Sequence, residues 1–316
     1  MPARLRSALR APHGALALPA WVFLLGFFVA PVALVVWYSF GYKPGLFGTH
    51  ANDVLSFGRY GEALDATFLR TFWNTLRIGV LGTAICLVVA LPFAYWLAVK
   101  VPPRWRGLLL ALVLVPFWTN FLVRTLGWQI ALSPEGFVSS ILQSLGKEGP
   151  LQVLYTRGAV QLGVVYNYLP LMLLPMYVAL ERTSMSLREA SRDLGAGRWR
   201  TLRDITIPLA LPGIASGCLL VFVPLMGDYV TATVLGGAKG NMVGQLVASQ
   251  FQTAQNWALG SAMAVVLVLF TGATVLLTAL VVIVLRMFVR RSRRVTLPRS
   301  PDLTPTHLHA TRGMSL

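Results

Sequence analysis

The chain alternates long apolar runs with short polar connections, and this alternation predicts its architecture. A helix that crosses a bilayer needs about 20 mostly apolar residues, each rising about 1.5 Å. Open strands would leave backbone groups unpaired in hydrocarbon, and the runs are too long for barrel strands. We therefore expect an all-α membrane protein with six transmembrane helices. The six runs lie at about 17–40, 76–99, 107–130, 158–180, 209–235 and 257–285.

Basic residues gather in alternate connections, which predicts the orientation of the helices. Most of the 27 Lys and Arg residues fall before the first run, after the second, after the fourth and after the sixth. Connections rich in Lys and Arg remain in the cytoplasm. We expect both termini to be cytoplasmic, with a basic N-terminus at 1–14, a six-span domain at 15–289 and a basic tail at 290–316. The first run is too long for a signal-peptide core, so we expect it to be retained as a span.

Two segments on the opposite side of the membrane have a helical pattern of their own. The stretch FLRTFWNTLRIG, which begins at Phe68, reads as an amphipathic approach to the second span. Residues 240–256 carry no charge, and their apolar positions recur at helical spacing. We expect a short helix there, lying on the outer surface of the bundle.

Composition and charge narrow the class of protein. The chain is 56% hydrophobic and 12% charged, whereas an ordinary soluble domain has about 25% charged residues. Its net charge of +16 would suit a nucleic-acid partner, but the basic residues are spread between apolar runs and no recognition motif accompanies them. We expect lipid around the protein and no nucleic acid. Cys86 and Cys218 lie in apolar runs without nearby metal-ligand partners, so we expect small core residues and no metal site.

The polar connection at 181–208 contains the stretch EASRDLGAGRWRTLRDITIP, which begins at Glu189. Ser186 and Glu189 have the spacing of a capping box, which predicts a helix that begins near Leu187. Gly195 and Gly197 would then end that helix, since glycine adopts the left-handed conformation without strain.

A second helical piece is expected over 198–206, followed by Pro208 and Pro212 in the first turn of the fifth span. The result is a helix-turn-helix elbow at the membrane surface. Its spacing alone is equally compatible with a loop that anchors to anionic lipid through its arginines.

The elbow resembles the EAA loop of ABC importer permeases, which reads Glu-Ala-Ala, three residues, Gly, nine residues and Ile-x-Leu-Pro. Ser191 replaces the third small residue, and Ile207 replaces the leucine. Four further stretches are similar to the spermidine/putrescine permeases of the type I importers: PFWTNFLVRT, YNYLPLMLLPMY, LPGIASGCLLVFVPLMGDYV and LGGAKGN. The residues that match the EAA loop are Glu189, Ala190, Gly195, Ile205 and Pro208.

The resemblance implies the type I ABC importer permease fold in a bacterial inner membrane. It also implies three partners: a cytoplasmic ABC ATPase dimer gripping the elbow, a second permease subunit, and an extracytoplasmic solute-binding protein. ATP and Mg would be used by the ATPase, so this chain would bind no cofactor and catalyse nothing. Glu189 would anchor the elbow to a basic partner, or pair with Arg192 one turn on. The implied solute is a polyamine; an opine, an amino-phosphonate or an iron complex is the alternative.

Ionisable residues within the runs are candidates for the transport pathway, because each costs about 2.5–3.5 kcal/mol at the bilayer centre. Arg124 and Asp228 fall at similar depth, so they either neutralise each other or leave Asp228 to attract a cation. Aromatic faces attract ammonium groups, although tyrosines and tryptophans also form belts at membrane interfaces. The candidate pathway residues are Trp118, Asn120, Tyr166, Asp228 and Tyr229.

Two other classes of protein fit the sequence less well. An intramembrane enzyme would need a catalytic motif at membrane depth, but all 4 histidines lie outside the runs and no His-Glu-x-x-His or Walker-type loop is present. A secondary transporter driven by an ion gradient would show internal repeats and several membrane carboxylates. Asp228 is the only carboxylate within the six apolar runs.

Overall fold

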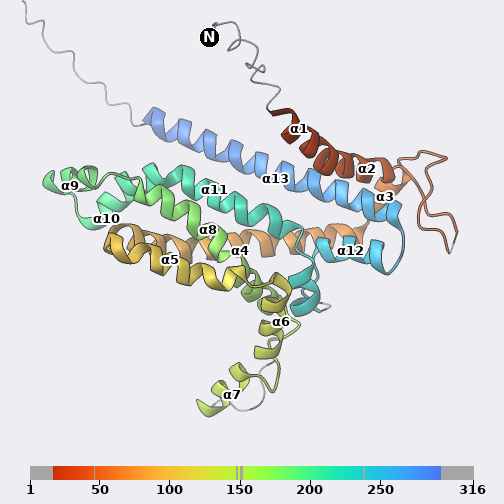
Figure 1. Ribbon diagram of the computed structural model, residues 1–316, viewed down its shortest axis with the longest axis horizontal. Helices are drawn as coiled ribbons and strands as arrows, with labels where there is room; N and C mark the ends of the chain where they lie inside the picture. Colours follow the sequence, from red (N-terminus) through yellow and green to blue (C-terminus); the bar gives the residue numbers. More distant parts are fainter. Residues whose placement is uncertain (1–16, 46, 147–148, 150–151, 238, 293–316) are drawn as a thin grey trace, which may run out of the picture. The chain divides into compact units, whose positions relative to one another are not determined.

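The computed structural model describes residues 17–45, 47–146, 149, 152–237 and 239–292, whose regular structure is helical apart from one β-bridge between Tyr42 and Ala51 (Figure 1). Within these residues, 5 helices are long and apolar enough to cross a membrane, or 6 if one bent pair counts as a single span. The expected all-α membrane fold is confirmed. The basic N-terminus at 1–14 and the tail beyond Ser292 lie outside the described residues.

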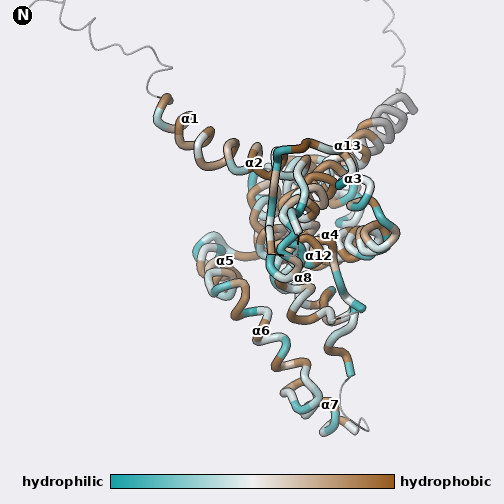
Figure 2. The backbone as a smooth tube through the Cα atoms, turned by 90° about the vertical axis from the view of Figure 1, so that its right-hand side faces the viewer, coloured by the Kyte–Doolittle hydropathy of each residue, from teal (hydrophilic) through white to brown (hydrophobic). Residues whose placement is uncertain are grey.

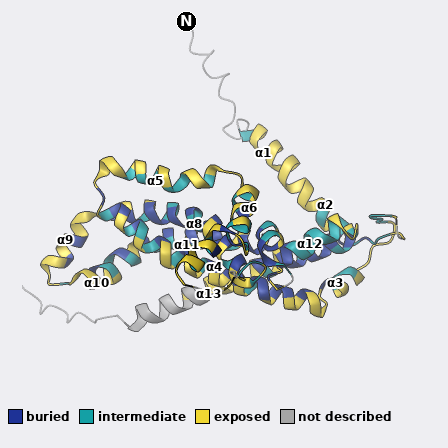
Figure 3. Cartoon of the chain, turned by 90° about the horizontal axis from the view of Figure 1, so that it is seen from below, coloured by how far each residue is buried: buried dark blue, intermediate teal, exposed yellow. Residues whose placement is uncertain are grey.

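The first span consists of α1 (Leu18–Leu24), the π-helical segment η3 (Leu25–Val29) and α2 (Ala30–Tyr38). None of its residues is buried in this chain. Figure 2 shows the apolar colour running along the helices, and Figure 3 shows α1 and α2 largely exposed. A span with this much exposed apolar surface is stable only against lipid or another protein. The outer connection that follows carries α3 (Gly58–Ala63).

The core is formed by α4 (Ala66–Val99), α8 (Arg157–Glu181) and α11 (Ile207–Met226). Glycines let these helices approach closely: a Cβ on Gly82 would lie 2.9 Å from Val164 Cγ1, and one on Gly217 would lie 3.1 Å from Met172 O. A Cβ on Gly213 would overlap Ala179. These side-chain-free positions fix the spacing of α4 and α11 against α8.

Helix α4 begins well before the expected start of the second span at residue 76. Asp65 caps the helix, with Oδ1 accepting a hydrogen bond of 2.7 Å from the Phe68 amide. Phe68 is completely buried and Phe72 is 9% exposed. The amphipathic approach and the span are therefore one continuous helix, because a cap and a buried aromatic face start it early.

The third apolar run is not the single helix expected over 107–130. It contains α5 (Pro103–Trp118) and α6 (Phe121–Ala131), whose axes differ by 85°. Thr119 is extended at φ −71° and ψ 153°, and Asn120 Oδ1 accepts a hydrogen bond of 2.8 Å from the Leu122 amide. The N-cap at Asn120 starts a new helix in a new direction. Helix α7 (Phe137–Ser144) follows.

The fifth run also differs from the expected span at 209–235. Its helix starts at Arg198 as α10 (Arg198–Thr201), passes through the π-helical segment η4 (Leu202–Thr206) and continues as α11. Pro208 lies in the first turn of α11, as expected, but Pro212 lies inside the helix. Gly227 ends α11, and a separate π-helical segment, η5 (Ala232–Gly236), follows.

Of the remaining helices, one lies where it was expected and the last extends beyond its expected end at residue 285. The expected short helix within 240–256 is α12 (Val243–Gln252), whose Val243 is completely buried. The last helix is α13 (Trp257–Ser292). The chain divides into two compact units after Gly272, so α13 belongs to both. Every site discussed below lies in the first unit.

Candidate functional site

The elbow between α8 and α11 is formed by α9 (Met185–Asp193), a short turn and α10. Ser184, not Ser186, occupies the N-cap position of α9, and neither serine caps a backbone amide of the helix. Their hydroxyls instead lie 2.5 Å apart. The expected capping box is therefore wrong, although the helix that it predicted is present.

Gly195 ends α9 in the left-handed conformation, with φ of +84°. Its amide donates to Arg192 O at 2.8 Å, and the Ala196 amide donates to Ser191 O at 3.0 Å. These bonds satisfy carbonyl groups that the end of a helix leaves free. No atom lies within 4 Å of a Cβ built on Gly195. The backbone conformation, and not crowding, therefore requires glycine at this position.

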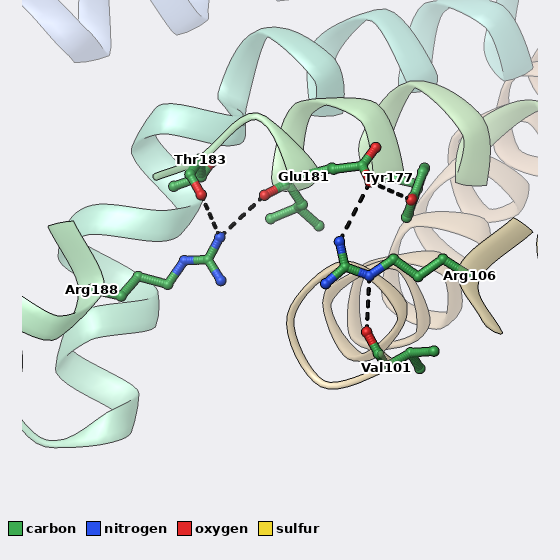
Figure 4. A network of polar contacts seen from close by, with 7 residues as sticks. Val101, Arg106, Tyr177, Glu181, Thr183 and Arg188 are labelled. Carbon is green, nitrogen blue, oxygen red and sulfur yellow. Dashed lines mark hydrogen bonds and ion pairs between the residues drawn. The ribbon is translucent and has the colours of Figure 1, made fainter. Parts of the chain in front are cut away.

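Arg188 holds the elbow to the end of α8. Its side chain is buried, and Nη2 donates to Thr183 O at 2.7 Å and to Leu180 O at 3.2 Å (Figure 4). Burial lowers the pKa of the Arg188 guanidinium, but an arginine stays protonated at physiological pH. The sequence pattern grouped Arg188 with the lipid-facing arginines of the loop and missed this role.

A second group of polar contacts joins the same end of α8 to the start of α5 (Figure 4). Glu181 Oε1 accepts a hydrogen bond of 2.7 Å from the Tyr177 hydroxyl and lies 3.5 Å from Arg106 Nη1. Arg106 Nε also donates to Val101 O at 2.9 Å, in the turn between α4 and α5. The base of the elbow is therefore tied to α8, to α5 and to the turn that follows α4.

Most of the surface of α9 and α10 is exposed (Figure 3). Glu189 and Ala190 are both exposed on α9. Neither Glu189 nor Arg192 belongs to an ion pair among the described residues, so the local pairing weighed for Glu189 does not form. Of the other EAA-like positions, Ile205 is half-buried in η4 and Pro208 is exposed. Large apolar side chains are also exposed here, with exposed fractions of 64% for Met185, 47% for Leu187, 89% for Leu194 and 82% for Trp199.

Asp228 lies where α6, α8 and η5 meet, in the break that follows α11. The residue is 6% exposed, and its Oδ1 accepts a hydrogen bond of 3.0 Å from the Thr231 amide. Oδ2 is buried and accepts no hydrogen bond of ordinary geometry from the described residues, although the Tyr168 phenol lies nearby. A buried carboxylate oxygen without a donor is costly, which makes it a candidate ligand for a cationic group.

Arg124 and Asp228 do not form the ion pair that the sequence left open. The Arg124 guanidinium instead lies over two aromatic rings, 5.3 Å from the centre of Phe117 on α5 and 5.6 Å from that of Phe121 on α6. Such contacts stabilise a cation by about 0.5–2 kcal/mol. The carboxylate of Asp228 therefore remains free of a basic partner among the described residues.

The other candidate pathway residues are spread over three segments. Trp118, which is 83% exposed, and Asn120 lie at the break between α5 and α6. Tyr229 follows Asp228 and is 46% exposed. Tyr166 lies on α8, where its ring packs edge-to-face against Trp128 at 5.4 Å. The two breaks are close to each other because α6 contacts η5, but the exposed rings of Trp118 and Tyr229 are not part of the buried cluster around Asp228.

Comparison with known proteins identifies relatives over most of the chain. Residues 90–294 match a family described as "Binding-protein-dependent transport system inner membrane component". The spermidine/putrescine transport system permease protein PotB of Haemophilus influenzae is 36% identical over 275 residues, which cover 87% of this chain and 93% of that protein. PotB of Escherichia coli is 39% identical over 224 residues, covering 71% of this chain and 81% of the relative.

A solved structure has a similar fold. It is a bacterial ABC transporter involved in the import of the acidic polysaccharide alginate, and its matching chain gives a TM-score of 0.68 at 16% identity. The match covers 93% of this chain and 100% of the other. The likeness concerns the arrangement of helices.

Proposed function

This chain belongs to the family of binding-protein-dependent transport system inner membrane components, and from that premise we propose that it is the permease subunit of an ATP-driven polyamine importer. The observation that carries the proposal is the 36% identity to a spermidine/putrescine permease across 87% of this chain. Proteins of this size and similarity share a fold, but a solute must still be argued from the site.

The elbow supports the proposed coupling to a cytoplasmic ATPase dimer. It presents Glu189 without an internal partner, together with the exposed Leu194 and Trp199. Interfaces between proteins are enriched in such apolar and aromatic anchors. Arg188 holds α9 against α8, and α10 continues into α11 without a break in the helix. A movement imposed on the elbow from the cytoplasm would therefore reach two spans at once.

Asp228 supports the proposed solute class. Polyamines carry several ammonium groups, and each ammonium offers three hydrogen-bond donors. The buried Asp228 carboxylate has one oxygen, Oδ2, that accepts no hydrogen bond of ordinary geometry from the described residues, and no ion pair with an arginine neutralises it there. We assign Asp228 the role of an ammonium ligand on the pathway. Tyr168 lies next to it and offers an aromatic face and a phenol.

The test is uptake by the complete importer, reconstituted in vesicles with its second permease, its ATPase and its solute-binding protein. Radiolabelled putrescine or spermidine should accumulate only when ATP and Mg are present on the ATPase side. An opine, an amino-phosphonate and an iron complex serve as competing solutes. Accumulation of one of these in place of a polyamine would refute the solute class, and transport by this chain without any ATPase would refute the coupling.

A further inference from the structure

A polar pocket lies at the opposite end of α8 from the elbow. It has a volume of about 760 Å³. Its walls come from the first turns of α4, the first turn of α8 and the connection between η5 and α12. Helix α8 has 25 residues, so at about 1.5 Å per residue the pocket is about 37 Å from the elbow, the depth of a bilayer. The lining residues are Thr67, Arg70, Thr71, Asn74, Thr156, Arg157, Gly158, Lys239 and Asn241.

The pocket has three cationic side chains and no acidic one in its lining. Arg70, Arg157 and Lys239 are all exposed, and none belongs to an ion pair among the described residues. Arg157 donates through Nε to Lys239 O at 3.3 Å, which leaves its terminal nitrogens available. The N-terminus of α8 adds the positive end of a helix dipole.

Close contacts fix the backbone of the connection that forms one wall of the pocket. Asn74 Nδ2 donates to Asn241 O at 2.6 Å and joins α4 to the connection. Gly237, at φ +52°, would place a Cβ 2.9 Å from Tyr155 Cβ. A Cβ on Gly240 would lie 2.8 Å from Gly236 O. These close approaches, together with a hydrogen bond of 2.8 Å from the Gly240 amide to Gly236 O, position the backbone next to Lys239, which lines the pocket.

The charge of the pocket decides which molecules it can take. Three like charges without counter-ions repel a polyamine, so this pocket is not a binding site for the solute proposed above. They attract a carboxylate or a phosphate, which Arg binds through several parallel hydrogen bonds. The pocket is much larger than one carboxylate, so it has room for a protein loop that carries an acidic side chain.

We propose that Arg70, Arg157 and Lys239 form a docking pocket for an acidic side chain of the extracytoplasmic solute-binding protein. The inference rests on the proposed function, which requires such a partner and places this end of α8 outside the cytoplasm. The solute-binding protein would then contact one end of α8, and the ATPase would contact the elbow at the other end.

The test measures the affinity of the purified, solute-loaded binding protein for the complete transporter in nanodiscs of zwitterionic lipid. The variant with Arg70→Gln, Arg157→Gln and Lys239→Gln should bind about tenfold more weakly, since each exposed pair contributes a few-fold at most. The affinity of the unmodified transporter should fall as salt is added, and that of the triple variant should fall less. The matched control is Arg77→Gln, an exposed arginine of α4 that does not line the pocket; its affinity should be unchanged.

A photo-crosslinker provides a second measurement that does not depend on the stability of the triple variant. Attached at Lys239→Cys, it should capture the binding protein, whereas attached at Arg77→Cys it should not. Unchanged affinity of a triple variant whose melting temperature is normal would overturn the proposal. So would an effect confined to nanodiscs with anionic lipid, which would make a lipid phosphate the occupant.

The solute class is tested separately, by calorimetry of polyamine binding to the isolated binding protein. A failure there would remove the polyamine proposal and leave the pocket result standing. Loss of affinity in the triple variant with normal polyamine binding would support both.

Discussion

Gly195 occupies a backbone conformation that side chains rarely adopt, with open space around it. A residue with a Cβ in the left-handed region costs about 1–2 kcal/mol. Asparagine tolerates this region better than other residues, and β-branched residues tolerate it least. The turn of the elbow therefore selects residues by backbone torsion and not by side-chain volume.

Substitution at Gly195 should follow this order. We expect Gly195→Val to abolish most ATP-dependent uptake while the protein still inserts in the membrane, and Gly195→Asn to keep a large part of it. Uptake is measured beside the amount of protein in the membrane fraction. If a bulky and an asparagine side chain behave alike, the turn does not transmit movement in the way proposed.

Asp228 combines two roles within one carboxylate. Oδ1 accepts a hydrogen bond of 3.0 Å from the Thr231 amide, while Oδ2 is buried and accepts none of ordinary geometry from the described residues. Asparagine keeps an oxygen for the first role and removes the charge needed for the second. The substitution therefore separates a structural cap from an ammonium ligand.

We expect Asp228→Asn to lower polyamine uptake by about tenfold or more, equivalent to about 1.4 kcal/mol, with little change in melting temperature. Asp228→Ala should lower both, because it also removes the cap. The measurements are initial uptake rates and thermal unfolding in detergent. Normal uptake in the asparagine variant would exclude Asp228 as a ligand.

A few contacts at its base hold the elbow in place. Arg188 satisfies two carbonyls at the end of α8, and Ser191 and Thr201, both buried, join α9 to α10 with 3.1 Å between their hydroxyls. Losing the partner of a buried carbonyl costs about 1–3 kcal/mol. The rest of α9 is exposed, so these contacts determine where the helix lies.

Arg188→Met should loosen α9 and uncouple it from α8. The expected results are faster hydrogen exchange of the α9 amides and a loss of ATPase stimulation by the binding protein. Arg182→Met is the matched control, because Arg182 is exposed in the same connection and should show neither effect. Equal exchange in both variants would mean that the elbow is positioned by other contacts.

The sequence predicted the spans best where hydropathy alone determines them. The run at 158–180 corresponds closely to α8 (Arg157–Glu181), with Thr156 as its cap. The breaks after α5 and α11 were missed, because Asn120 and Asp228 were treated as polar groups on a continuous span. Both types of residue also cap helices, and Gly227 before Asp228 is a further signal of a helix end. Hydropathy averages cannot separate a polar residue within a helix from one that starts a new helix.

Within the elbow, the sequence predicted the helix and its glycine stop but not what holds it. The spacing of Gly195 after Glu189 was informative because a left-handed terminator is a local, one-residue requirement. The role of Arg188 depends on two carbonyls that face it only once α8 and α9 have folded against each other. Long-range hydrogen bonds of this kind leave no pattern in one sequence.

The proposed function requires an ATPase partner that contacts the elbow of the assembled transporter. A cysteine at Glu189→Cys, on the exposed face of α9, should crosslink to an ABC ATPase subunit in the assembled, actively transporting complex. The yield should change when ATP is bound, because closure of the proposed ATPase dimer would move the elbow. The control is a cysteine at Arg77→Cys, near the other end of the molecule. No crosslink from α9 in a transporting complex would exclude the proposed coupling.

The glycines between α8 and α11 have a mechanical consequence. Gly213 and Gly217 place α11 against the backbone of α8 near Pro175 and Met172, so neither helix can slide lengthwise without a steric collision. We therefore expect the two helices to tilt together. A tilt imposed on α8 and α11 at the elbow would then also displace their opposite ends. We expect the chain to bend at its two breaks, between α5 and α6 and after α11.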